Sequence, residues 1–259
     1  MIQTTFSLVT FEYFLLILVR ITAFMFVAPF FSMDGVPNMT KIGLAGIVSI
    51  MVVSVLHPEE AVYSSVIGYG LLVVKELACG ILIGFAASIC NSIVLFAGNV
   101  IDMDIGLSMV SEFDPTLNMQ TTVTGQLYYY FMLLLLLVSD MHTYILRAVI
   151  DSFTLIPLGG AEFDVNSLLT TFITYFTDMF SIAIRIMLPV MACMLITNCV
   201  LGIIAKVAPQ MNMFSVGVQI KILVGFAVMF VVIFLFPRVI GYIATEMKTM
   251  IVSMIRGMY

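Results

Sequence analysis

Charged residues are scarce in this sequence, which has ten Lys or Arg and fifteen Asp or Glu among its 259 residues. Charged residues make up 10% of the chain, hydrophobic residues make up 62%, and the mean hydropathy is +1.19. A soluble domain is typically about 25% charged and about 45–50% apolar. The composition therefore argues against a separate soluble domain and predicts a single membrane domain over residues 1–259.

The chain also lacks a basic patch, and its formal net charge is -5. Proteins that bind nucleic acid carry clustered Lys and Arg, so nucleic acid is not an expected partner. Cysteine and histidine are few and far apart in the sequence. The four cysteines lie inside apolar runs without a CxxC pair, and are Cys79, Cys90, Cys193 and Cys199. This pattern predicts buried free thiols and favours neither a disulfide nor a metal site.

A secretory signal is not indicated at the start of the chain. Residues 1–10 carry no positive charge, and the apolar run from Phe11 to Phe31 is longer than the apolar core of a signal peptide. That run also has no small-residue cleavage pattern. We therefore expect it to be the first membrane helix.

Motifs of enzymes are lacking as well. The sequence contains no GxSxG, HExxH, Walker loop or GxGxxG, and His142 has no nucleophile near it in the sequence. The sequence therefore predicts a protein that is not an enzyme and needs no cofactor. An intramembrane enzyme with scattered catalytic residues is an alternative that this search leaves open.

Long apolar runs dominate the sequence. They occur near residues 11–31, 42–56, 64–98, 123–150, 166–205 and 218–237. A membrane helix needs about 20 mostly apolar residues, so the third and fifth runs are each either a helical hairpin or one long helix. The pattern predicts an all-α, polytopic membrane protein with about six spans.

The charges between these runs give an inconsistent orientation. Positive loops mark the cytoplasmic side, and Lys41, Lys206 and Lys221 then place their loops inside. The polar stretch 99–122 is placed inside by parity, yet it carries four acidic residues and no Lys or Arg. Either a span is miscounted, or this stretch does not emerge on an ordinary membrane face.

The tail, residues 238–259, has a different pattern. Apolar residues repeat there at intervals of three and four, and are Ile240, Ile243, Met247, Met250 and Met254. This spacing predicts an amphipathic C-terminal helix, which lies on the membrane surface or packs on a partner helix.

Ionisable residues inside apolar runs are candidates for function. They are Arg20, Lys75, Glu76, Asp140, His142, Asp178 and Arg185. Asp178 and Arg185 would lie about 10 Å apart along one helix, so each needs a partner on another helix. A proton or ion relay is one interpretation, and a structural pair is favoured because no second carboxylate lies near Asp178.

Two features of the stretch 99–122 have alternative interpretations. Asp102 and Asp104 form either a cation site or, as we favour, a helix cap and a solvated loop. Methionine is frequent in the chain, with 21 residues, and Met103, Met109 and Met119 cluster here. Flexible Met side chains form either a deformable seal or ordinary core packing, and composition alone favours core packing.

Three groups of residues, in order along nearly the whole chain, resemble one family. The first group is Arg20-Ile21, Ala28-Pro29-Phe30-Phe31, Val36-Pro37 and Lys41-Ile42-Gly43-Leu44-Ala45; the second is Glu76, Gly80, Gly84, Ala97-Gly98, Asp102, Gly106-Leu107-Ser108 and Phe113-Asp114-Pro115; the third is Gly202, Lys206, Pro209-Gln210-Met211-Asn212, Phe214, Val216-Gly217, Lys221-Ile222 and Gly225. They resemble the flagellar biosynthetic protein FliR and its injectisome counterparts, the type III secretion export-gate family. The chain departs from the family at Val218-Gln219, where Phe-Pro is frequent, and at Asp104, where many members carry Gln.

The resemblance implies a role in protein export. Members assemble with FliP-like and FliQ-like subunits into a helical hetero-oligomeric pore complex that carries unfolded export substrates, and an FlhB-like subunit packs at its cytoplasmic side. The implied location is the bacterial inner (cell) membrane at the flagellar basal body, in contact with membrane lipid. Much of such a complex stands above the usual bilayer plane, which would explain the inconsistent charge pattern.

The resemblance also implies roles for particular residues. The stretch after Gly98 corresponds to the pore plug, so Met103, Ile105, Leu107, Met109 and Phe113 become candidates for the closed seal. The implied structural motif residues are Gly98, Asp102, Gly106, Pro115, Pro209, Asn212, Phe214 and Gly217, the last four forming a turn between the last two long helices.

An ion or small-molecule transporter is the alternative function. Asp178 with Arg185, and Asp102 with Asp104, would be its coupling groups. Transporters often show two matching halves, and the sequence shows no such internal symmetry.

Overall fold

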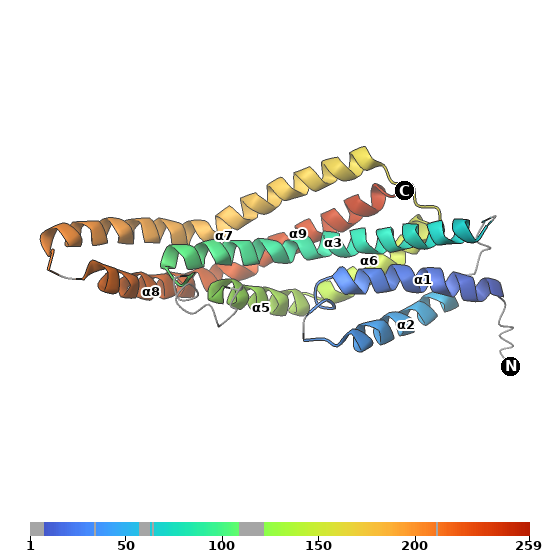
Figure 1. Ribbon diagram of the computed structural model, residues 1–259, viewed down its shortest axis with the longest axis horizontal. Coiled ribbons are helices and arrows are strands. Elements are labelled where there is room, and N and C mark those ends of the chain that lie inside the picture. Colours follow the sequence, from blue (N-terminus) through green and yellow to red (C-terminus); the bar gives the residue numbers. More distant parts are fainter. Residues whose placement is uncertain (1–7, 34, 57–62, 64, 109–121, 211) are drawn as a thin grey trace. The chain divides into compact units, whose positions relative to one another are not determined.

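The computed structural model describes residues 8–33, 35–56, 63, 65–108, 122–210 and 212–259. These residues form helices and contain no strand, as the sequence predicts. The helices are α1 (Leu8–Val27), α2 (Asn38–Val55), α3 (Val66–Ile105), α5 (Val123–Val138), α6 (Met141–Leu155), α7 (Val165–Val207), α8 (Met213–Val232), the short 3₁₀ helix η2 (Ile233–Leu235) and α9 (Phe236–Arg256) (Figure 1).

The two longest apolar runs each form one unbroken helix. Helix α3 has 40 residues and α7 has 43, so the hairpin alternative for these runs is wrong. Helix α7 continues through Pro189, and membrane helices tolerate a proline where neighbouring groups satisfy the backbone group that it leaves free. At 1.5 Å per residue the two helices are about 60 and 65 Å long.

Five helical segments in the described part of the chain are long and apolar enough to cross a membrane, or six if the bent pair α5 and α6 counts as one more. The fourth apolar run is broken at Ser139 and Asp140. Asp140 has the left-handed φ of 55° there, and α6 begins one residue later. The prediction of an all-α, polytopic membrane protein is confirmed, and the number of true spans stays a prediction.

The polar stretch after Gly98 begins differently from our expectation. Helix α3 continues to Ile105, so Asp102 and Asp104 are helical and do not lie in a turn. Gly106 then ends the helix with a φ of 92°, a conformation that favours glycine. The lysines used to orient the chain also lie in helices, with Lys41 buried in α2 and Lys221 inside α8.

The chain divides into two compact units, and the prediction of a single domain stays untested. The first unit comprises Met1–Ile89, Asp140–Tyr175 and Thr245–Tyr259, and the second comprises Cys90–Ser139 and Phe176–Ala244. Helix α9 contributes buried side chains to both, namely Ile240 and Ile243 to the second unit and Met247, Met250 and Met254 to the first.

Close helix contacts at glycine organise the first unit. A Cβ atom on Gly80 of α3 would overlap the carbonyl oxygen of Arg20 in α1, and one on Gly84 would lie 3.0 Å from the Phe24 carbonyl oxygen. Only glycine lets the two backbones approach this closely. The same face of α1 buries Ile17, Ile21 and Phe24 completely, so α1 and α3 form the centre of this unit.

The second unit is organised in the same way at another point of α3. Gly98 lies against the backbone of Gly125 in α5. Farther along, the side chain of Ile105 fills the space beside Gly225 of α8, where an added Cβ would lie 2.6 Å from the Ile105 Cδ1 atom. The fully buried Tyr128 ring packs on Phe236, with 4.5 Å between ring centroids.

Replacing Gly80 with Ala should destabilise the first unit by about 1–3 kcal/mol, because the added methyl group overpacks the contact between α1 and α3. The thermal unfolding midpoint of the purified protein in detergent measures this change. The matched control is Gly70→Ala on the same helix, where nothing lies within 4 Å of the added Cβ. The control should raise stability by about 0.5–1 kcal/mol, and equal midpoints for both variants would contradict the packing argument.

Candidate functional site

Arg20 and Glu76 are the most deeply buried charged side chains that the structure describes, and the solvent exposure of each is zero. The Arg20 Nε atom lies 2.5 Å from Glu76 Oε2, and this ion pair is fully buried. Its Nη1 atom donates to Ser152 Oγ at 3.3 Å, and both Nη atoms donate to the Ile156 carbonyl oxygen at 3.2 Å. The guanidinium also lies 4.3 Å from the centroid of the Phe153 ring.

Glu76 completes this arrangement with its second oxygen. Its Oε1 atom accepts a hydrogen bond from the Gly159 backbone N–H at 2.9 Å. The neighbouring Lys75 donates from Nζ to the Gly159 carbonyl oxygen at 3.4 Å. The turn between α6 and α7 is therefore attached to α3, and we refer to Arg20, Glu76, Ser152, Ile156 and Gly159 as the Arg20 centre.

The position of the Arg20 centre follows from the glycine contact beside it. Glu76 and Gly80 are four residues apart and share a face of α3. Gly80 touches the backbone at Arg20, so the Glu76 carboxylate reaches the guanidinium. The sequence marked Arg20 and Glu76 separately, and the structure pairs them. Ser152 and the two backbone groups carried no sequence signal, because carbonyl and N–H groups are present at every residue.

A second buried polar centre lies in the second unit, around Asp102. This carboxylate is 1% exposed and accepts hydrogen bonds from the Thr124 backbone N–H at 3.0 Å and from the Thr124 hydroxyl. Nearby, the Thr122 hydroxyl donates to Asn99 Oδ1 at 2.6 Å. Asp102 therefore supplies an acceptor to the N-terminus of α5, where backbone N–H groups lack helical partners.

The alternative interpretation of Asp102 and Asp104 as a cation site gains no support from this geometry. Asp102 is engaged with Thr124, while Asp104 is half-buried on another side of α3. Within the described ranges, no group of three or more His, Cys, Asp or Glu side chains could hold a metal ion.

Asp178 and Arg185 of α7 are not paired by the structure. Asp178 is half-buried and Arg185 is exposed, and neither takes part in an ion pair with another described residue. Their expected partners on other helices are not found in this part of the chain. His142 lies with its ring 6.4 Å from that of Phe30, and its buried Nδ1 atom has no hydrogen-bond partner among the described residues.

The cysteines are free thiols, as predicted, but not all are buried. Cys79 and Cys90 are buried in α3, Cys193 is half-buried and Cys199 is exposed. The prediction of burial is wrong for Cys199, which lies on an exposed side of α7.

The candidates for a pore seal have different environments. Met103 is 70% exposed, Ile105 is fully buried beside Gly225, and Leu107 is half-buried. Met109 and Phe113, together with the motif residue Pro115, lie outside the described residues. The burial of Ile105 makes it an anchor for the end of α3.

The motif that follows α7 forms a turn, shorter than we expected. Helix α7 ends at Val207 and α8 begins at Met213, so Pro209 and Asn212 lie in the turn. Phe214 and Gly217 belong to α8. The Phe214 side chain is 62% exposed, which leaves it available to a neighbouring molecule.

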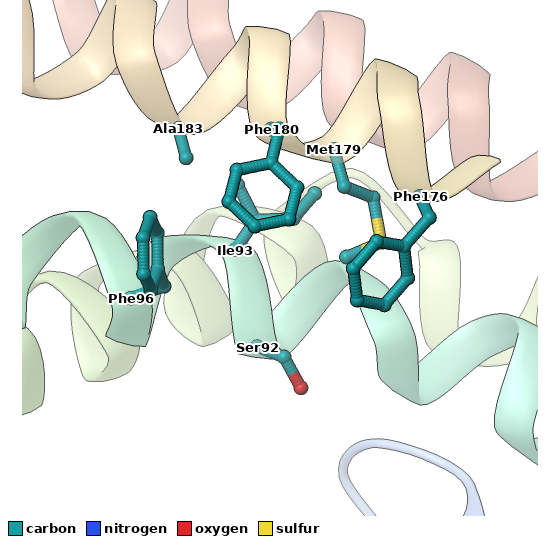
Figure 2. Close-up of a pocket in the computed structure, with 7 residues that line it drawn as sticks. All are labelled: Ser92, Ile93, Phe96, Phe176, Met179, Phe180 and Ala183. Carbon is teal, nitrogen blue, oxygen red and sulfur yellow. The ribbon is translucent and has the colours of Figure 1, made fainter. Parts of the chain in front are cut away.

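A surface pocket of about 190 Å³ lies between α3 and α7 in the second unit. Figure 2 shows Phe176, Met179 and Phe180 of α7 facing Ile93 and Phe96 of α3, with the Ser92 hydroxyl pointing away from them. Because its lining is apolar and carries no charged side chain, the pocket suits an apolar side chain or an acyl chain and offers no catalytic group.

The buried charges therefore hold helices together, and the outer surface is mainly apolar. These features define an integral membrane protein built from long helices. The family model described as bacterial export proteins, family 1, matches residues 11–247. The chain therefore belongs to this family, as the resemblance of its motifs indicated.

Relatives with known names agree with this membership. The flagellar biosynthetic protein FliR of Buchnera aphidicola subsp. Acyrthosiphon pisum (strain APS) is 26% identical over 237 residues, which cover 92% of this chain and 90% of that protein. FliR of Bacillus subtilis (strain 168) is 30% identical over 223 residues, or 85% and 86% of the two chains. The surface presentation of antigens protein SpaR of Shigella sonnei is 30% identical over 161 residues, or 62% and 61%.

Replacing Glu76 with Gln should destabilise the protein by about 3–5 kcal/mol, because it leaves the Arg20 guanidinium buried without a counter-charge. The amount of folded protein in membranes and its unfolding midpoint measure the effect. The double variant Arg20→Met with Glu76→Met should recover most of the loss, since both charges are then absent. The control Arg185→Gln removes an exposed charge and should change stability by less than about 0.5 kcal/mol. An E76Q variant as stable as this control would show that the pair is dispensable.

Proposed function

We propose that this chain is a subunit of the export gate of a flagellar type III export apparatus. It lines a pore for unfolded export substrates together with FliP-like and FliQ-like subunits, and an FlhB-like subunit packs at its cytoplasmic side. The complex lies in the bacterial inner membrane at the flagellar basal body. The chain acts as part of a conduit and has no catalysis of its own.

The names of the relatives support a role in a flagellar export apparatus. The length of the helices supports association of this chain with other subunits. The hydrocarbon core of a bilayer is about 30 Å thick. Helices α3 and α7 are about twice that length, and a tilt of 40°, the upper end of the usual range, still leaves about 45 Å along the membrane normal. A single bilayer therefore cannot cover either helix from end to end.

Exposed apolar side chains occur along the whole length of α7, among exposed polar ones. Its exposed apolar side chains extend from Val165 to Val207, and include Leu169, Ile173, Phe176, Leu188, Leu195 and Ile203. Water is unfavourable for such a surface, and exposed apolar patches of this extent mark interaction sites. Other protein helices must cover the part that lipid does not reach, and this is the observation that carries the proposal.

Purification of a tagged copy of this chain in mild detergent should recover FliP-like and FliQ-like subunits in defined ratios, identified by mass spectrometry. Deletion of the gene should abolish flagellum assembly, and the tagged copy should restore it. The control is an unrelated polytopic protein with the same tag from the same membranes. A monomer that restores motility without these partners would refute the assembly.

The seal assignment gives a separate prediction. Met103 projects from the end of α3 with 70% of its surface exposed, so in the assembled gate we expect it to contribute to the closed seal. Replacing Met103 with Ala should raise the ion leak of cells with a closed gate, because a shorter side chain leaves a gap. The control Met39→Ala changes an exposed methionine of α2, which is 83% exposed, and should leave the leak unchanged.

The same increase is expected for the variants Met109→Ala and Phe113→Ala. Equal leak in the M103A and M39A variants would remove Met103 from the seal and would leave the assembly itself unaffected.

A further inference from the structure

The end of α3 and the start of α5 are joined by hydrogen bonds within the second unit. The Asp102 carboxylate of α3 accepts from both the backbone N–H and the hydroxyl of Thr124. About one turn earlier on α3, Asn99 Oδ1 accepts from the hydroxyl of Thr122, the residue before α5, at 2.6 Å. We refer to Asn99, Asp102, Thr122 and Thr124 as the α3–α5 clasp.

Close packing holds the helices together on both sides of the clasp. Gly98 lies against the backbone of Gly125, and a Cβ atom on Gly98 would overlap it. At the other side, the fully buried Ile105 side chain fills the space beside Gly225 of α8, which attaches the last turn of α3 to a third helix. The clasp is therefore part of the packed interior of this unit.

Opening the clasp would leave the Asp102 carboxylate without donors. Asp102 is 1% exposed and makes no ion pair with any residue that the structure describes. Its charge is therefore stabilised by the N-terminus of α5, through the Thr124 N–H and hydroxyl. Removing the partner of a buried charge costs more than losing an ordinary hydrogen bond, so the closed clasp is strongly favoured over an open one.

The clasp encloses the stretch of sequence that carries most of the candidates for the seal. The residues that it joins are 22 and 23 positions apart, and Leu107, Met109 and Phe113 fall between them in the sequence. Gly106 ends α3 immediately after the clasp, with its φ of 92°. The backbone is thus held by packing up to Ile105 and changes direction at the next residue.

We propose that the α3–α5 clasp positions the seal and stays closed when the gate opens. This inference rests on the proposed function and deepens it, because it names the residues that support the seal. A support that keeps one geometry brings the seal back to the same place after each substrate has passed. Export therefore requires no separation of Asn99 from Thr122 or of Asp102 from Thr124.

A reversible cross-link across the clasp tests this inference. Asn99→Cys and Thr122→Cys are introduced together into a chain whose two less buried cysteines, Cys193 and Cys199, are replaced by Ser. The new thiols are joined in cells with a short bifunctional methanethiosulfonate reagent and released again with dithiothreitol. Mass spectrometry of the purified complex measures the extent of linkage, and the rate at which a flagellar substrate reaches the medium measures export. The two single-cysteine variants, treated in the same way, control for effects of the reagent.

The linked and the reduced forms of the N99C/T122C variant should export the substrate at the same rate, because nothing at the clasp has to separate. Export that stops on linkage and returns on reduction would show that the two helix ends move apart, and would overturn the proposal. Thiols that cannot be linked in the assembled complex would show that the two positions are not adjacent there, which also overturns it.

The hydroxyl of Thr124 gives a second test. Thr124→Val keeps the shape of the side chain and the backbone N–H, but it removes one hydrogen bond to a carboxylate and should weaken the closed clasp about tenfold. The ion leak of cells with a closed gate should therefore rise. Thr124→Ser should keep the leak of the parent, and the cross-link between positions 99 and 122 should restore that leak in the T124V background, which a general loss of folding would not allow.

The matched control for T124V is Thr170→Val on α7. Thr170 is exposed, and its hydroxyl bonds to the Asn166 carbonyl oxygen of its own helix at 2.8 Å, so its loss should leave the leak unchanged. Equal leak in the T124V and T170V variants would remove the clasp from the support of the seal.

Recovery of the FliP-like and FliQ-like subunits separates this inference from the proposed function. Failure of these subunits to copurify with the parent chain would refute the proposed function. With the subunits present, export that the cross-link arrests would refute the role of the clasp alone. If T124V itself fails to assemble, the cross-link in the chain with Thr124 intact still decides the question.

Discussion

A charged side chain in apolar surroundings needs a full set of hydrogen-bond partners or contact with water. The charges of this chain meet that requirement in different ways. Arg20 is satisfied by Glu76, Ser152 and the Ile156 carbonyl oxygen, and Asp102 is satisfied by the start of α5. These buried charges connect elements far apart in the sequence.

Glycine makes the satisfied arrangements possible. Gly80 brings α3 against the backbone of Arg20, and Gly98 brings it against Gly125 of α5. In each case the polar contact lies about one turn from the glycine, because the carboxylate of Glu76 or Asp102 is four residues away on the same face. Helix packing without a large hydrophobic driving force depends on such small residues, and here they also determine where the charges meet.

The sequence was sufficient to predict the fold class, the family and most helices, since apolar length and motif order are local properties. It was also sufficient to single out Arg20 and Glu76 as buried ionisable groups. Their pairing could not be predicted, because it depends on a contact between helices 56 residues apart. The continuation of α3 through Asp102 was missed because acidic residues and glycine resemble a loop when Thr124, the hydrogen-bond partner of Asp102, is not visible in the sequence.

The apolar surface of α7 has a consequence for the turnover of the chain in the cell. A copy without partners exposes side chains such as Phe176, Leu188 and Ile203 that a complete complex would cover. Membrane quality control removes proteins that remain incompletely packed, so turnover depends on occupancy by partners. Under the proposed assembly, the abundance of this chain would follow that of its scarcest partner subunit, because copies without partners would be degraded.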